Sequence, residues 1–173
     1  KFNESWYTGE TLNTAIGQGY TLSNPLQLAV MIARIASNGK KIVPTMFKNK
    51  AKIEFAQIKN ISKHTKLINN ALFKVVNEQR GTANSSKSKE YLFSGKTGTS
   101  QVKRITLSER ASDDFGKLEV EWKNRDHALF VGYMPSENPK YAISVVIEHG
   151  GSGASIAAPI AKKIFDYIHK QKI

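Results

Sequence analysis

Apolar side chains recur at helical spacing in three stretches of the chain. The first stretch follows Ser23 or Asn24, either of which can cap a helix, with Pro25 in the first helical position. Its apolar residues cover most of the helix surface, which indicates burial. The sequence Ser-Asn-Gly at residues 37–39 then favours a left-handed stop, so the pattern predicts one buried helix between these signals.

Two further helices are predicted later in the chain. One begins at Ser62 or Thr65 and ends near residues 80–81, where Arg-Gly interrupts the apolar spacing. The other covers residues 154–170, with Pro159 within its first two turns, where the loss of one backbone N–H is least harmful.

Three stretches have the composition of β-strands, at residues 91–102, 127–134 and 141–148. They follow one another without an intervening helical pattern, which predicts an antiparallel sheet with helices on its faces, an α+β fold. The first 24 residues are rich in Gly, Thr and Asn and are expected to form an ordered loop. Residues 103–126 are expected to form a long connection, a kind of segment that is often functional.

Composition narrows the class of protein. The chain has 173 residues, 40% hydrophobic and 23% charged, which is typical of one globular domain. It has no cysteine, which excludes disulfides and thiolate metal sites, and its histidines lack the spacing of metal ligands. We therefore expect no metal and no cofactor. No apolar run reaches the length of a membrane helix. The chain does not begin with Met, so we expect it to be a piece of a longer protein.

The net charge of +12 comes from 26 Lys and Arg against 14 Asp and Glu. Such an excess permits attraction to nucleic acid, anionic lipid or an acidic polymer. The lysines are scattered, however, and they do not alternate with aromatic residues as in single-strand-binding proteins. A solvated basic surface is therefore favoured, and no nucleic-acid partner is expected.

The clearest candidate site lies in the first predicted strand, in Gly95, Lys96, Thr97, Gly98 and Thr99. Glycine weakens a strand unless a backbone or ligand comes close, Lys96 carries a positive charge, and the threonines offer hydroxyls. This combination suits an anionic or carbonyl-bearing ligand. An ordinary Gly- and Thr-rich strand remains the alternative on this motif alone.

A phosphate-binding loop is a further alternative for this stretch. That motif requires a glycine at position 90, which is Glu90, and a helix after the Gly-Lys-Thr. No helical pattern follows here, so we reject it.

Several stretches together resemble the C-terminal half of the transpeptidase domain of class B penicillin-binding proteins, and most of all the cell-elongation type, penicillin-binding protein 2. The resemblance covers nearly the whole chain, in the family's order. It rests on residues 13–20, 24–29, 80–83, 94–102, 127–133, 138–142, 150–153 and 157–161.

The resemblance implies a partial penicillin-binding-protein/β-lactamase-like fold in which residues 1–173 are the C-terminal portion of one transpeptidase domain. It implies a serine enzyme that cross-links peptidoglycan stem peptides through an acyl-enzyme and binds β-lactams. It also implies elongation-complex partners and a place on the periplasmic side of the inner membrane, with the parent protein anchored by an N-terminal helix.

The family uses Ser-x-x-Lys, Ser-x-Asn and Lys-Thr-Gly in that order. Only Lys-Thr-Gly is in place; Ser-x-x-Lys at residues 37–40, 86–89 and 100–103 and Ser-x-Asn at 136–138 have the wrong local structure or order. We therefore expect the nucleophile, the base and the middle motif to lie before Lys1, and this chain to be inactive alone.

The resemblance also implies roles for the motif that is present. Lys96 would attract the substrate carboxylate, and the hydroxyls of Thr97 and Thr99 would bind it. Gly98 would allow close approach, and the Thr99 backbone N–H would supply half of an oxyanion hole. Lys96 and Thr99 are thus the expected catalytic residues, and Thr97, Gly98 and Thr99 the expected substrate-binding residues.

Two other functions stay open at this point. One is a penicillin-recognising hydrolase, either a class D-type β-lactamase or a D,D-carboxypeptidase. The other is a non-catalytic module, either a β-lactam sensor or a basic polymer-binding domain. Because apolar faces would be left uncovered in such a piece, self-association is also expected.

Overall fold

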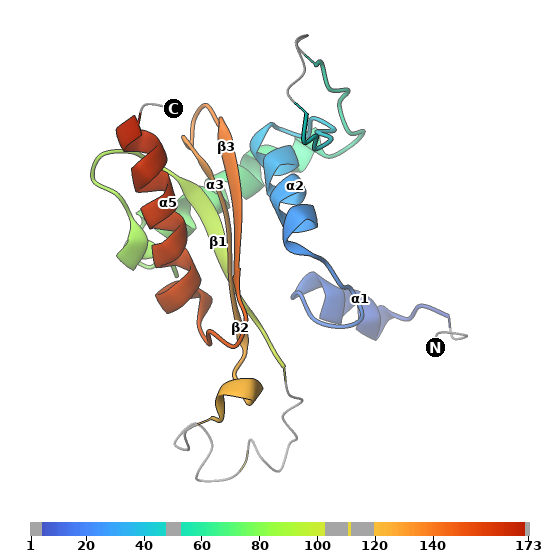
Figure 1. The fold of residues 1–173 in the computed structure, drawn as a ribbon. Helices are drawn as coiled ribbons and strands as arrows, with labels where there is room; N and C mark the ends of the chain where they lie inside the picture. The colour runs from blue at the N-terminus through green and yellow to red at the C-terminus, as the bar shows by residue number, and fades with distance from the viewer. Residues whose placement is uncertain (1–4, 48–52, 103–110, 112–119, 172–173) are drawn as a thin grey trace.

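The computed structural model describes residues 5–47, 53–102, 111 and 120–171. Figure 1 shows a sheet between helices. The helices are α1 (Thr8–Ala15), α2 (Pro25–Ala36), α3 (Ser62–Asn77) and α5 (Ala158–Gln171), and the strands are β1 (Ser94–Ser100), β2 (His127–Met134) and β3 (Tyr141–Ile147). Short helical turns are η1 (Asn84–Ser86), η2 (Trp122–Asn124) and the π-helical η3 (Gly153–Ala157).

Within the described residues, the sheet has three strands in the order β1-β2-β3, and both pairs are antiparallel. In Figure 1, α5 lies on one face of this sheet and α2 on the other, while α3 crosses behind it. Val76 of α3 packs in the layer of α5, and Leu72 of α3 packs in the layer of α2. The predicted α+β class, with an antiparallel sheet flanked by helices, is therefore confirmed.

Side chains on β2 alternate between the two faces, as the period of a strand requires. Phe130 packs with Phe165 of α5 and with Phe93, and the Phe93 ring centroid lies 5.3 Å from that of Phe165. Tyr133 instead packs with Ile32 of α2 and with residues of α3. One strand thus joins two apolar layers, so β2 is the centre of the fold.

Both ends of α2 follow the local signals in the sequence. The Asn24 side chain accepts a hydrogen bond of 2.9 Å from the Gln27 N–H, and the Gln27 side chain accepts one of 2.9 Å from the Asn24 N–H. This is a capping box, with Pro25 in the first helical position. Asn38 and Gly39 end the helix with φ values of 57° and 90°, as predicted.

The prediction for the first 24 residues was wrong in part, because residues 8–15 form the helix α1. The positive-φ glycines, Gly17 and Gly19, follow this helix rather than interrupt it.

The predicted long connection at 103–126 lies mostly outside the described residues, and its described end contains η2. In the described part of the chain, no helix is long and apolar enough to cross a membrane.

The start of β1 is tied to α5 by a polar contact. The Tyr91 hydroxyl donates a hydrogen bond of 2.7 Å to Asp166, and Lys162 Nζ lies 2.6 Å from the other carboxylate oxygen. Burial and the bond to Asp166 raise the pKa of Tyr91, which keeps the phenol a donor. Burial raises the pKa of Asp166, but hydrogen bonds from Lys162 and Tyr91 outweigh it and hold that pKa below its ordinary value of 3.8.

This contact predicts a pH-dependent stability difference between the wild type and Asp166→Asn. A depressed pKa stabilises the fold fully above the unfolded-state pKa, and this stabilisation is lost as the pH falls through the folded-state pKa. The amide of the variant cannot ionise, so the wild type should be more stable at pH 7 by about 1 kcal/mol. Urea unfolding at pH 7 and at lower pH should show the difference shrinking toward acid. A difference that is constant with pH would contradict this explanation.

A pair of glycines lets β1 lie against β2. Gly95 and Gly132 are opposite each other in the register. A Cβ at Gly95 would lie 2.3 Å from the Phe130 ring and 2.5 Å from the Val131 carbonyl oxygen. A Cβ at Gly132 would lie 2.7 Å from the same ring and 2.7 Å from the Ser94 carbonyl oxygen. The ring of Phe130 therefore occupies the space that side chains at both positions would need.

These contacts predict that the two motif glycines differ in their tolerance of alanine. Gly95→Ala should lower the free energy of unfolding by about 1–3 kcal/mol, because the new Cβ overlaps a buried ring and a backbone oxygen. Gly98→Ala should cost well under that, since its Cβ meets only the Leu129 Cβ, at 3.3 Å. Urea unfolding of both variants measures the contrast, and equal losses would argue against it.

Candidate functional site

The candidate site lies on β1, which pairs with β2 along one edge. Among the described strands, no other pairs with β1, so its second edge is open. An open edge presents backbone N–H and C=O groups to an extended ligand. Lys96, Thr97, Gly98 and Thr99 all lie on this strand, so the structure places the predicted site residues side by side.

Lys96 is exposed, and its Nζ donates a hydrogen bond of 2.8 Å to the Thr97 carbonyl oxygen. Its cross-strand neighbour is Val131, which packs with the layer of α2 and α3. Within the described residues, no carboxylate forms an ion pair with Lys96. The ammonium group can therefore turn toward an anionic ligand without leaving a buried partner.

The threonines alternate with Lys96 along the strand. Thr97 and Thr99 lie opposite Phe130 and Ala128, which belong to the layer of α5. Residues directly opposite in an antiparallel pair share a face, so the lysine and the threonines point to different faces. A ligand can reach both kinds of side chain only from the open edge of β1.

Thr82 is a neighbour of the site that lies outside the Lys-Thr-Gly motif. Its hydroxyl lies 2.9 Å from the Thr97 hydroxyl, so one of the two donates to the other. Thr82 follows α3 and lies 15 positions from Thr97 in the chain. The Arg-Gly-Thr-Ala stretch at residues 80–83 was the available signal, although it does not specify which strand residue the threonine meets.

Partly buried hydrogen bonds fix the start of β1. The Asn77 side chain donates to the Phe93 carbonyl oxygen at 3.0 Å, and the hydroxyls of Ser94 and Ser136 lie 2.8 Å apart. On β2, the Tyr133 hydroxyl donates to the side-chain oxygen of Asn69 at 3.0 Å. Burial raises the pKa of Tyr133, against a smaller lowering by Ser94, so its phenol remains a donor. These contacts hold the strand while leaving its outer edge open.

The structure also locates the serines of the misplaced motifs. Ser37 donates to the Arg34 carbonyl oxygen at the end of α2, and Ser136 is bonded to Ser94. Ser86 is 2% exposed and lies in η1, so no large substrate can reach it. Ser100 is exposed at the end of β1, but Lys103 lies outside the described residues. Among described residues, none of these serines is hydrogen-bonded to a lysine amine, as a nucleophile and its base would be.

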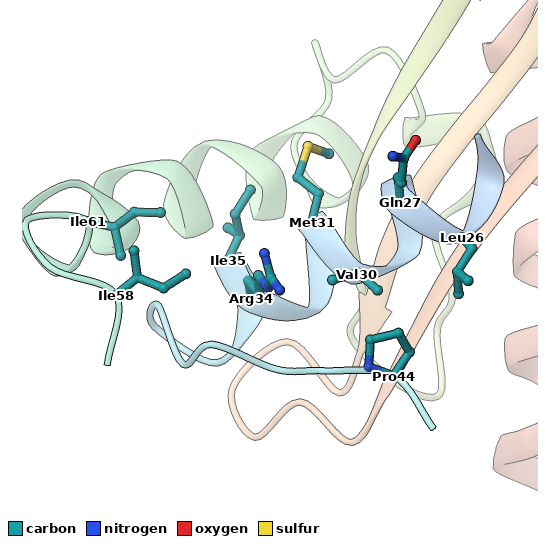
Figure 2. A pocket seen from close by; sticks show the side chains of 9 residues that line it. All are labelled: Leu26, Gln27, Val30, Met31, Arg34, Ile35, Pro44, Ile58 and Ile61. Atoms are coloured by element: carbon teal, nitrogen blue, oxygen red, sulfur yellow. The ribbon is translucent and has the colours of Figure 1, made fainter. Parts of the chain in front are cut away.

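A groove of about 540 Å³ lies on α2, away from the motif residues of β1. Figure 2 shows its lining of apolar side chains from α2 with Pro44, Ile58 and Ile61, joined by Gln27 and Arg34. It contains neither a nucleophile nor a carboxylate. The groove is therefore mainly apolar and separate from the motif residues of β1.

The described residues contain no group of three or more His, Cys, Asp or Glu that could hold a metal ion. His127 and His149 do lie close together, with ring centroids 4.8 Å apart. His127 Nδ1 accepts a hydrogen bond from the His149 backbone N–H, so this nitrogen is already occupied.

Residues 1–166 match the family described as penicillin binding protein transpeptidase domain. The peptidoglycan D,D-transpeptidase MrdA of Haemophilus influenzae is 32% identical over an alignment that covers 100% of this chain and 28% of that protein.

Solved structures give a similar result. The complex between penicillin-binding protein (PBP2) and MreC from Helicobacter pylori matches with a TM-score of 0.79 at 30% identity, over 99% of this chain and 29% of that one. Pseudomonas aeruginosa PBP2 in complex with WCK 5153 matches with a TM-score of 0.72 at 34% identity, over 95% of this chain and 34% of that one.

This chain thus spans about 28% of the length of the Haemophilus relative. The match nevertheless runs through the described helices and strands and includes the Lys-Thr-Gly strand. The resemblance to the penicillin-binding proteins, and to PBP2 among them, is confirmed. The chain belongs to the family of penicillin-binding protein transpeptidase domains.

Proposed function

We propose that residues 1–173 are the C-terminal portion of a peptidoglycan D,D-transpeptidase domain and supply the strand along which the substrate lies. The observation that carries this proposal is the open edge of β1, which presents Lys96, Thr97, Gly98 and Thr99 together. The relatives named as peptidoglycan D,D-transpeptidases favour this activity over a penicillin hydrolase.

The reaction begins with a serine in the preceding part of the domain. Its oxygen attacks the carbonyl carbon of the penultimate D-Ala of a stem peptide, and the terminal D-Ala leaves with a proton on its amine. An amine of a neighbouring stem peptide then attacks the acyl-enzyme, forms the cross-link and returns the serine. β-Lactams acylate the same serine because they resemble the D-Ala-D-Ala end.

The residues of β1 have three roles in this proposal. The charge of Lys96 attracts the terminal carboxylate, and the hydroxyls of Thr97 and Thr99 bind it from the open edge. The missing side chain of Gly98 lets the peptide backbone approach. The Thr99 N–H donates to the oxyanion that forms at the attacked carbonyl, a contribution of about 3–4 kcal/mol in comparable enzymes.

The position of Thr97 supports its role as a carboxylate ligand. Its hydroxyl is bonded to that of Thr82, and a hydroxyl that donates can also accept. If Thr82 donates to Thr97, the proton of Thr97 is directed toward a ligand at the strand edge. Thr82 is then a positioning residue for the carboxylate site.

The proposed setting follows from the relatives. We propose that the parent protein acts on the periplasmic side of the inner membrane and assembles with elongation-complex proteins. A Helicobacter relative, solved in complex with MreC, supports the second point. No metal or cofactor enters the proposed reaction.

The proposal predicts that the nucleophile lies outside this chain. Intact mass after incubation with a penicillin should be unchanged for the 173 residues and raised by one drug molecule for a protein extended at its N-terminus to the length of its relatives. Lys96→Ala in the extended protein should slow acylation by about 10²-fold, because the site loses its cation. Lys63→Ala, an exposed lysine on α3, is the matched control.

Three outcomes would count against the proposal. Acylation of the 173-residue chain would place a nucleophile within it. No acylation of the extended protein would favour a non-catalytic module. Rapid turnover of the penicillin by the extended protein would favour a hydrolase.

The apolar groove on α2 suggests what happens to the chain in isolation. Leu26 and Met31 line the groove and are 61% and 43% exposed. We propose that the preceding part of the domain covers this surface in the parent protein. In the isolated chain, two copies can pack their exposed grooves against each other, because exposed apolar patches tend to find partners.

This predicts concentration-dependent self-association of the 173-residue chain. Sedimentation equilibrium should give a mass above that of the monomer at high concentration, and Met31→Glu should shift the mass toward the monomer by placing a charge in the groove. Leu67→Glu is the control, since Leu67 is exposed on α3 and does not line the groove. A monomeric mass of the wild type at all concentrations would refute the association.

A further inference from the structure

The turn that follows β3 is hydrogen-bonded to the segment that precedes β2. The His149 N–H donates to His127 Nδ1 at 2.9 Å, and the Gly151 N–H donates to the Asp126 carbonyl oxygen at 2.8 Å. The His149 ring Nδ1 lies 3.1 Å from the Arg125 carbonyl oxygen. Residues 149–153, which we call the glycine turn, are thus tied to residues 125–127 at three points.

Side-chain packing and backbone conformation limit the glycine turn further. The ring centroid of His149 lies 4.5 Å from that of Trp122 and 4.8 Å from that of His127. His149 has a φ of 55°, which a residue with a side chain rarely adopts. An uncommon conformation of this kind persists only where surrounding contacts hold it. The contacts to residues 122–127 therefore determine the path of the turn.

The glycine turn ends directly on the candidate site. A Cβ at Gly153 would lie 2.3 Å from the Gly98 carbonyl oxygen, 2.4 Å from the Leu129 carbonyl oxygen and 3.0 Å from the Gly98 nitrogen. Gly153 is buried, and its φ is not in the left-handed region. Glycine is therefore needed here for space, because the backbone of the turn lies against the backbone of β1.

This contact reaches the proposed oxyanion donor through one peptide bond. The carbonyl of Gly98 and the N–H of Thr99 belong to the same planar peptide group. Any shift of the Gly98 carbonyl oxygen rotates or moves the Thr99 N–H with it. Gly98 is paired with Leu129 of β2, and Gly153 packs against the carbonyl oxygens of both, so the ladder and the glycine turn together hold this peptide group. On its other side, β1 has no strand partner among the described residues.

We propose that His127, His149 and Gly153 are positioning residues that set the direction of the Thr99 N–H by holding the glycine turn against Gly98. The inference rests on the proposed function, because it assigns these residues to the oxyanion hole of that reaction. The positioning role can be distinguished from a purely structural role by the step that it affects. A positioning role affects the acylation step, whereas a structural role affects folding and leaves the rate of the folded protein unchanged.

The first test uses Gly153→Ala in the extended protein. A penicillin is used to measure two quantities, the dissociation constant of the initial complex and the rate constant of acylation. We expect acylation to slow by about tenfold or more, since oxyanion donors contribute 10²–10³-fold, while the dissociation constant changes by less than about threefold. Ile168→Ala is the matched control, because Ile168 packs at the distal part of α5 and its loss lowers stability without touching the glycine turn.

The second test uses two variants of His127 and stays informative if Gly153→Ala does not fold. His127→Phe removes the acceptor for the His149 N–H, whereas His127→Asn can place its side-chain oxygen where Nδ1 lies. We expect His127→Phe to be acylated more slowly than the wild type and His127→Asn to be acylated at most of the wild-type rate. Melting temperatures of both variants show whether they differ in stability.

The outcomes separate this inference from the proposed function. Failure of the wild-type extended protein to be acylated would refute the proposed function itself. If the wild type is acylated and folded Gly153→Ala or His127→Phe reacts within about twofold of it, the positioning role is refuted, given the size expected for an oxyanion donor. Equal rates in His127→Phe and His127→Asn would refute the role of the His127 acceptor. Slowing by Ile168→Ala to the same extent would show that stability alone explains the effect.

Discussion

The fold depends on the packing of one aromatic ring over two glycines. Phe130 covers Gly95 and Gly132, which face each other across β1 and β2, and neither position has room for a Cβ. The same ring lies 6.3 Å from that of Phe93, which in turn packs on Phe165 of α5. This series of contacts joins the strand that carries the candidate site to its neighbouring strand and to the C-terminal helix.

The remaining elements leave the outer edge of β1 free while fixing its position. The layer of α5 holds the strand from one face, and α3 with Tyr133 and Asn69 holds β2 from the other. The glycine turn adds a backbone contact at Gly98, in the middle of the strand. These contacts fix the position of the strand, and preorganised donors of this kind are what electrostatic stabilisation of a transition state requires.

Local signals in the sequence were sufficient for much of the fold. The cap at Asn24 and the stop at Asn38 and Gly39 define α2, and β-rich stretches define β2 and β3. The helix α1 was missed because its composition is that of a loop, with Thr, Gly and Asn among its residues. Propensity is a weak guide for so short a segment.

The candidate site could be predicted only in part from the sequence. Lys96, Thr97, Gly98 and Thr99 are consecutive, so a linear motif places them together. The contacts of Thr82 with Thr97 and of Gly153 with Gly98 join distant parts of the chain, and no periodicity encodes them.

The role of β1 is best tested by a crystal structure of the extended protein after acylation by a penicillin. We expect the acyl oxygen about 2.7–3.1 Å from the Thr99 nitrogen and the drug carboxylate against the hydroxyls of Thr97 and Thr99. An acyl group bound away from the open edge of β1 would contradict this role.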